Sequence, residues 1–206
     1  GYNGAIKYYK HHLNHLASSF YPSEFKKSLV VSYDGVGEGE TGYFAIGKNK
    51  RLEVIHNRNK FPNSLGLIYA AITSYLGWRH ASDEGIIMGL ASYGKPHDKI
   101  PKKNKTYIQI FREIISFENN LDLIINTDWI TFHKERDTWL SKKFINTFSK
   151  KRLYKNKLTQ HHKNIAAALQ LRLEEVILSQ LKYLKNKYKF NNLCLSGGVG
   201  LNCSMN

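Results

Sequence analysis

The sequence has few of the residues that mark secreted or membrane proteins. Its 206 residues include two cysteines; neither lies in a C-x-x-C pair, which excludes a disulfide framework and a metal site of that type. Cys194 lies in an apolar segment, where we expect a buried, reduced thiol. The richest apolar run, residues 65–78, is short and is interrupted by Thr73 and Ser74, so it is typical of a core helix. With no signal-peptide pattern, we expect a cytoplasmic protein without membrane contact.

Acidic residues are also scarce. The chain has 16 Asp and Glu against 31 Lys and Arg, a formal net charge of +15. This balance allows binding to nucleic acids, acidic membranes or phosphorylated small molecules. The lysines are spread along the chain, however, and the densest run, residues 149–157, is typical of a solvated loop. We therefore do not expect nucleic acid as a partner.

The hydrophobic pattern predicts an α/β protein. A long amphipathic helix that runs straight into a buried strand and a Gly-Gly loop implies α/β layering. We expect residues 35–42 to form a loop between two strands. The helices are expected at residues 6–20, 65–76, 83–90, 107–115, 138–147 and 161–188, and the strands at residues 28–33, 43–46, 52–55, 121–125 and 192–196.

Histidines and an aspartate near the start form a candidate metal site. On a helix, His11 and His15 lie one turn apart and can share a metal ion, and a pair of His12 and His15 is also geometrically possible. Asp34 ends an apolar strand, where its carboxylate can meet a metal or a phosphate-bound ion. Two imidazoles and one carboxylate suit Fe, Mn or Zn acting as a Lewis acid. The alternatives are solvated histidines and an Asx turn that starts a hairpin.

Glycine segments are the candidates for ligand binding. Gly197 and Gly198 follow the last strand, where backbone amides can approach a phosphate with no Cβ in the way, and Asn202 can bind the same ligand. Gly35 and Gly37 leave similar space for an anion. Plain turns are the alternative at both places.

An acidic residue opens the segment E-G-I-I-M-G-L-A-S-Y-G, residues 84–94. Glu84 can act there as a general base, or it can simply place negative charge at the start of a helix.

Taken together, these segments resemble the O-carbamoyltransferases of the NodU/CmcH type. Residues 11–21, H-H-L-N-H-L-A-S-S-F-Y, resemble the family signature HHxxHAxSAFY. The resemblance continues through residues 34–38, residues 63–77, residues 84–94 and residues 197–202, in the same order and at the same spacing over nearly the whole chain.

The resemblance implies an α/β, actin/Hsp70-like fold of two ribonuclease-H-like halves with mixed sheets and flanking helices. The same fold is implied for the related tRNA threonylcarbamoyl transferase subunit. We expect a partial domain that is incomplete at both ends, hence a fragment of a longer protein. Residues 1–98 would form the core of the first lobe, residues 99–160 an insertion or connecting helices, and residues 161–206 the start of the second lobe.

The resemblance also implies an activity. A carbamoyl group would pass from carbamoyl-adenylate, made from carbamoyl phosphate and ATP by a separate domain, to a hydroxyl of a sugar, an antibiotic or a nodulation-type metabolite. It allows a homodimer. The implied site consists of the metal ligands His11, His15 and Asp34, usually for iron, the nucleotide-binding residues Gly197, Gly198 and Asn202, and Glu84 near the reaction centre. Gly35 and Gly37 join the nucleotide-binding candidates because they leave space for an anion.

The chain departs from the family pattern in several places. Ile86 stands where members commonly have Lys, and Ser92 where they have Pro. The N-terminal strand motif, the Asp-containing segment after the Gly-Gly loop and the adenylate-forming domain are not in this sequence. We therefore expect the chain alone to lack a fourth metal ligand and activity. Two alternatives stay open: a tRNA threonylcarbamoyl transferase-like protein, favoured by the charge, and a non-catalytic nucleotide-binding fragment.

Overall fold

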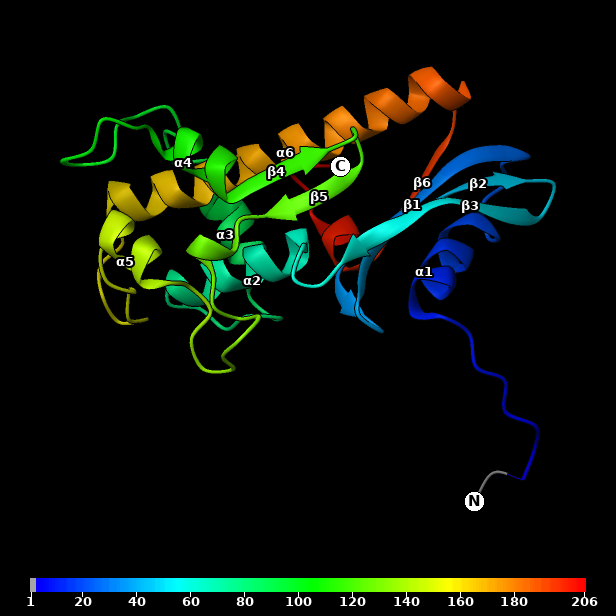
Figure 1. Cartoon of the computed structure of the whole chain (residues 1–206), viewed down its shortest axis with the longest axis horizontal. Helices are drawn as coiled ribbons and strands as arrows, with labels where there is room; N and C mark the ends of the chain where they lie inside the picture. Colours follow the sequence, from blue (N-terminus) through cyan, green and yellow to red (C-terminus); the bar gives the residue numbers. More distant parts are fainter. Residues whose placement is uncertain (1–2) are drawn as a thin grey trace.

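A mixed four-stranded sheet lies at one end of the molecule and a group of helices at the other, as the computed structural model shows for residues 3–206 (Figure 1). The strand order is β3-β2-β1-β6. The first three strands are antiparallel, and β6 pairs with β1 in parallel. The strands are β1 (Lys27–Gly37), β2 (Glu40–Lys48), β3 (Arg51–Lys60) and β6 (Leu193–Ser196).

Strand β1 lies inside the sheet, between β2 and β6, and both of its faces are covered. Leu29 and Val31 point into the main core with α2 and α6, whereas Val30 packs against α1 in a smaller cluster with Leu16 and Phe20. Alternate side chains of a strand point to opposite faces, so this apolar run fits a strand buried on both sides.

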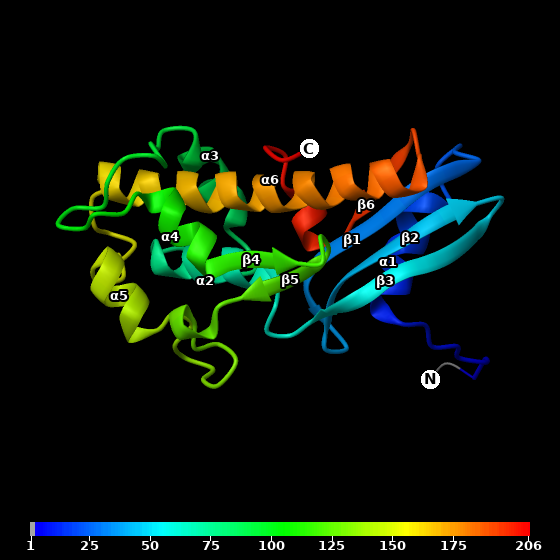
Figure 2. The ribbon, with the colours of Figure 1, turned by 45° about the horizontal axis from the view of Figure 1, so that its top comes forward.

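The helices fill the other end and cross the sheet. Figure 2 shows α6 running along almost the whole length of the molecule, from the helical end to the sheet. The helices are α1 (His11–Phe20), α2 (Leu65–Tyr75), α3 (Glu84–Ala91), α4 (Tyr107–Ile114), α5 (Lys142–Phe148) and α6 (Gln160–Tyr188), with the short 3-10 helices η1 (Thr127–Trp129) and η2 (Gly198–Leu201).

The predicted loop over residues 35–42 is wrong, because this segment is a hairpin. Strand β1 continues to Gly37, and β2 begins at Glu40. Glu38 and Gly39 form the two-residue turn with φ of 55° and 83°, the left-handed conformation that tight hairpins require. The β1–β2 register shifts between Tyr33 and Gly37, so Asp34 lies at an irregularity within the strand rather than at its end.

Helix α1 begins at His11, five residues later than predicted. Ile6, Tyr8 and Tyr9 are 63%, 89% and 65% exposed, so an earlier start would bury no apolar face to stabilise the extra turn. Helix α5 begins at Lys142 instead of residue 138, because Leu140 bridges to Ile130 and the Ser141 side chain caps the helix.

A second hairpin lies within residues 99–160, the segment predicted as an insertion or connecting helices between the two lobes. Strand β5 (Asp122–Ile125) lies close to the predicted strand, but its partner β4 (Ile115–Glu118) was not predicted, and its first residue was assigned to the end of a helix. The Thr106 side chain caps α4, and its last turn ends where Ile115 becomes extended and joins the hairpin.

Strand β6 lies in the same sheet as β1, with Leu29 opposite Leu193 and Ser32 opposite Ser196. Helix α6 contributes Ile165, Leu169 and Leu173 to the same core as β1. Residues on both sides of the boundary predicted near residue 160 thus share one sheet and one core, and the division into lobes stays a prediction. Of the predicted first lobe, residues 1 and 2 lie outside the described range. Across residues 3–206, no helix is both long and apolar enough to cross a membrane.

We expect two glycine substitutions to change stability in opposite directions. In Gly94→Ala, the new Cβ would lie 2.1 Å from the Lys163 carbonyl oxygen and 2.5 Å from the Ala167 Cβ on α6, so the free energy of unfolding should fall by about 1–3 kcal/mol. In Gly89→Ala, within α3, the Cβ meets no atom within 4 Å, so the free energy should rise by about 0.5–1 kcal/mol. Urea denaturation measures both, and an unchanged Gly94→Ala would contradict the packing of this segment on α6.

Candidate metal centre

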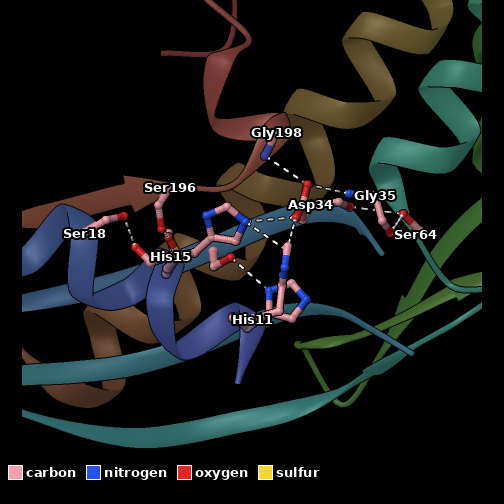
Figure 3. A network of polar contacts seen from close by, with 11 residues as sticks. His11, His15, Ser18, Asp34, Gly35, Ser64, Ser196 and Gly198 are labelled. Carbon is pink, nitrogen blue, oxygen red and sulfur yellow. Dashed lines mark hydrogen bonds and ion pairs between the residues drawn. The ribbon is translucent and has the colours of Figure 1, made fainter. Parts of the chain in front are cut away.

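Helix α1 and strand β1 bring two histidines and one aspartate together (Figure 3). Nε2 of His11 lies 2.7 Å from Oδ2 of Asp34, and Nε2 of His15 lies 3.0 Å from the same oxygen. The two Nε2 atoms are 3.0 Å apart. The predicted juxtaposition of these three side chains is therefore confirmed, and together they could hold a metal ion.

The amphipathic pattern of α1 determines which histidines face Asp34. Leu16 and Phe20 are buried against the sheet, and His12 is buried with them. His11 and His15 lie on the flank of the helix, with side chains 39% and 30% exposed. The structure thus selects the pair one turn apart over the alternative pair of His12 and His15.

His12 contacts the sheet and not Asp34. Its Nδ1 lies 3.0 Å from Oγ of Ser32 on β1, and its ring stacks on Tyr43 with centroids 5.1 Å apart. Burial is the main cause that lowers the pKa of His12 below its usual value of 6.5, so the ring is neutral at pH 7. It therefore fixes α1 on the sheet beside the two exposed histidines.

The two carboxylate oxygens of Asp34 have separate partners. Oδ1 accepts hydrogen bonds from the Gly35 amide at 2.8 Å and the Gly198 amide at 3.1 Å, whereas Oδ2 faces the histidines. Burial would raise the pKa of Asp34, but the hydrogen bonds from His11, both amides and His15 outweigh it and lower the pKa to about 2. The group is thus an oriented carboxylate at neutral pH.

The first turn of α2 packs directly on the backbone beside Asp34. The Ser64 hydroxyl donates to the Gly35 carbonyl at 2.6 Å, with the Asp34 carbonyl 3.1 Å away. It also accepts from the Leu67 amide at 3.0 Å and so caps the start of α2. A Cβ on Gly66 would lie 2.7 Å from the Gly35 nitrogen. The sequence alone did not identify Ser64 or Gly66 as part of the site.

All four predicted ligand-binding glycines are in close contact with the metal centre or its supporting backbone. A Cβ on Gly37 would lie 2.1 Å from Cδ2 of His11. Gly197 has φ of 84°, and its Cβ would lie 2.2 Å from the Tyr33 carbonyl oxygen. The Gly198 amide already binds Asp34, so it holds a carboxylate of the chain itself. The Gly35 amide also binds Asp34, but its α-carbon has free space, because a Cβ there would meet only Leu67, at 3.9 Å.

The side chains of Asn202 and Glu84 form hydrogen bonds to other residues than those of the metal centre. Asn202 is 2% exposed and exchanges two hydrogen bonds with Gln170 of α6, at 2.9 and 3.0 Å. Oε1 of Glu84 accepts from the Ala81 amide at 2.6 Å, at the start of its own helix. Within residues 3–206, no ion pair or hydrogen bond joins either side chain to His11, His15 or Asp34. Their roles in ligand binding and catalysis stay predictions.

Comparison with known proteins agrees with the resemblance found in the sequence. The family model described as carbamoyltransferase N-terminus matches residues 2–206. The chain is 35% identical over 198 residues to an uncharacterised protein of Synechocystis sp., covering 96% of this chain and 31% of that protein. It is 31% identical over 198 residues to the nodulation protein NolO of Bradyrhizobium diazoefficiens, covering 95% of this chain and 32% of that protein.

A third relative is an uncharacterised protein of Methanocaldococcus jannaschii, 32% identical over 204 residues, with coverage of 99% of this chain and 36% of that protein. The chain thus spans about a third of the length of the curated relatives it matches. The family match nevertheless extends over almost all of the chain and includes every residue of the candidate metal centre. The chain belongs to the carbamoyltransferase N-terminus family.

Proposed function

We propose that this chain supplies the metal-binding part of an O-carbamoyltransferase. The whole protein would transfer a carbamoyl group from carbamoyl-adenylate to a hydroxyl of a small-molecule acceptor such as a sugar, an antibiotic or a nodulation-type metabolite. The observation that carries this proposal is the convergence of His11, His15 and Asp34 in a chain of the carbamoyltransferase family.

The three donor atoms suit a divalent transition metal. Their separations of 2.7, 3.0 and 3.0 Å approach the roughly 3 Å expected between adjacent ligands of an octahedral ion with bonds of about 2.1 Å. Two histidines and one carboxylate on one side of an ion leave the remaining positions for substrate and further ligands. This donor set favours Fe(II) as the resident ion.

A bound ion would act as a Lewis acid that neutralises the negative charge developing when the carbamoyl group is attacked. The chain's own residues hold that position in place. Asp34 is fixed by the Gly35 and Gly198 amides, so Oδ2 keeps its direction, and the buried ring of His12 keeps α1 in register beside it. Such preorganisation avoids rearrangement of the site during the reaction.

The acceptor hydroxyl must lose its proton as its oxygen bonds to the carbamoyl carbon and AMP leaves. Within this chain, Glu84 is the residue that we propose as the general base that accepts this proton. Its carboxylate is half-buried at the start of α3 and bonded to the Ala81 amide. Approach of an acceptor would have to replace this hydrogen bond.

We further propose that the complete protein has the actin/Hsp70-like fold of two ribonuclease-H-like halves. The sheet order β3-β2-β1-β6, with three antiparallel strands followed by a parallel one, supports this assignment for one half. Because the curated relatives are about three times as long as this chain, a second half and an adenylate-forming domain that uses ATP and carbamoyl phosphate would lie in the rest of the protein.

The full-length protein tests the activity. We expect the protein, supplied with Fe(II), ATP, ¹³C-labelled carbamoyl phosphate and a panel of sugars and aminoglycosides, to yield AMP and a labelled carbamate ester, detected by mass spectrometry. The His15→Ala protein should still make the adenylate but transfer no label. If neither label transfer nor AMP release occurs and the protein instead gives a salt-sensitive mobility shift with tRNA, the tRNA-type activity replaces this proposal.

We expect both metal-ligand variants to lose the ion. His11→Ala and His15→Ala each remove one of three donors, so the metal content after dialysis against limiting Fe(II) should fall about tenfold or more. Inductively coupled plasma mass spectrometry measures the content per chain. The matched control is His97→Ala, which removes an exposed histidine outside the cluster. Unchanged metal content in both ligand variants would refute the assignment.

A pair of glycine variants tests the packing behind His11. In Gly37→Ala, the new methyl group overlaps the His11 ring, so the ring must move and metal affinity should fall about tenfold or more. Gly35→Ala introduces only ordinary contact with Leu67, at 3.9 Å, and should keep its metal. Circular dichroism shows whether both variants are folded. Equal metal affinity of the two would mean that the position of His11 does not depend on Gly37.

A further inference from the structure

A cavity of about 600 Å³ lies at the far end of α2 from the metal centre. It is bounded by Ser74 in the last turn of α2 and Gly77 just after it, by Asp83 just before α3, and by residues 151–154 before α6. Helix α2 begins beside Asp34 at Ser64, and from Ser64 to Ser74 it rises about 15 Å at 1.5 Å per residue. The cavity is therefore separate from the metal centre, and both helices that bound it can be followed in Figure 1.

The wall of this cavity is strongly basic. It carries Arg79, Lys151 and Arg152 against a single carboxylate, Asp83. Asp83 is already engaged, since it accepts from the Arg79 amide at 2.9 Å and lies 3.6 Å from the Arg79 Nε. Among the ion pairs found in residues 3–206, neither Lys151 nor Arg152 has an acidic partner. The formal charge of the wall is three positive and one negative, a net +2.

Arg152 is the unusual member of this group, because it is only 7% exposed. Its guanidinium donates to the carbonyls of Leu76 and Tyr154, both at 2.7 Å, and of Asn156 at 2.9 Å. These acceptors are neutral, and the end of the α2 dipole offsets only about half a charge. A buried charge without a counterion is costly, so an anion bound in the cavity would supply what the described chain lacks.

The remaining wall is apolar and aromatic. The Arg152 guanidinium carbon lies 4.6 Å from the Trp78 ring centroid, and Trp78 itself lines the cavity. Leu153 and Tyr154 are 66% and 70% exposed, and Ile86 is 46% exposed. These side chains offer contact area to an organic group attached to the anion.

We infer that this cavity binds a phosphate monoester of a small organic molecule. A phosphate monoester carries about −1.5 to −2 charges at pH 7 and so matches the net +2 of the wall better than a single carboxylate does. The volume of about 600 Å³ falls within the roughly 300–1,000 Å³ of small-molecule sites. It leaves room for an organic part against Trp78 and Leu153. This site is additional to the metal centre and does not depend on carbamoyl transfer.

Isothermal titration calorimetry of the purified chain tests the inference, with glucose 6-phosphate as the probe and glucose and inorganic phosphate as comparisons. We expect the sugar phosphate to bind, glucose not to bind, and inorganic phosphate to bind about tenfold more weakly because it misses the apolar wall. Lys151→Ala and Arg79→Ala should each weaken the sugar phosphate about tenfold. Lys157→Ala, an exposed lysine of the same segment outside the cavity wall, is the matched control and should bind as the unsubstituted chain does.

His15→Ala separates the two sites. Sugar phosphate binding should be unchanged in this variant, and its loss would place the phosphate at the metal centre and overturn the inference. The inference is also overturned if no probe binds, if inorganic phosphate binds as tightly as the sugar phosphate, or if the cavity variants bind normally. An equal loss in Lys157→Ala would show general attraction to a basic surface, which likewise excludes a specific site.

Discussion

The carboxylate of Asp34 is the interaction on which the arrangement of this site depends. One oxygen binds the amides of Gly35 and Gly198, and the other faces His11 and His15. A single side chain thereby connects α1, β1 and the glycine segment after β6. Because hydrogen bonds to a charged group in a partly buried site are stronger than neutral ones, this carboxylate both orients the histidines and closes the end of the sheet.

Close backbone contacts make that arrangement possible. Gly37 leaves space for the His11 ring, Gly66 lets α2 touch the backbone beside Asp34, and Gly197 lies against the Tyr33 carbonyl. A side chain at any of these positions would push apart two elements that now share the carboxylate. Gly37 and Gly197, predicted as ligand-binding glycines, thus also have a structural role, which they share with Gly66: they let four segments meet around one aspartate.

The sequence predicted the metal ligands of the site, but it did not predict the contacts that hold these ligands in place. His11 and His15 are one helical turn apart, and Asp34 follows an apolar strand, so local patterns and the family resemblance were enough to bring them together. The contacts of Ser64 and Gly198 with the Asp34 segment join residues 30 and 164 positions apart in sequence, which no local pattern encodes. Asn202 has the residue type of a ligand-binding group, yet it pairs with Gln170 of α6, 32 positions away in the sequence.

The secondary structure also divides into elements that local sequence patterns predict and elements that depend on distant residues. The long apolar or amphipathic segments were predicted well, and α6 differs from its expected range by one residue at its start. Two of the errors depend on contacts with other segments: β4 is extended where it pairs with β5, and residues 6–10, which bury no apolar face, stay outside α1.

Helix α2 illustrates how such contacts supply what a sequence segment lacks. Eight of its eleven residues are buried, and it has no acidic residue in its first turn and no basic residue in its last. A helix so apolar cannot carry the charges that would stabilise its own dipole. At its end such a charge comes from another segment, because Arg152 donates to the Leu76 carbonyl. Negative charge near a helix start and positive charge near its end each contribute about 0.3–1 kcal/mol. Arg152, which lines the basic cavity, therefore also stabilises the end of the helix that begins beside the Asp34 backbone.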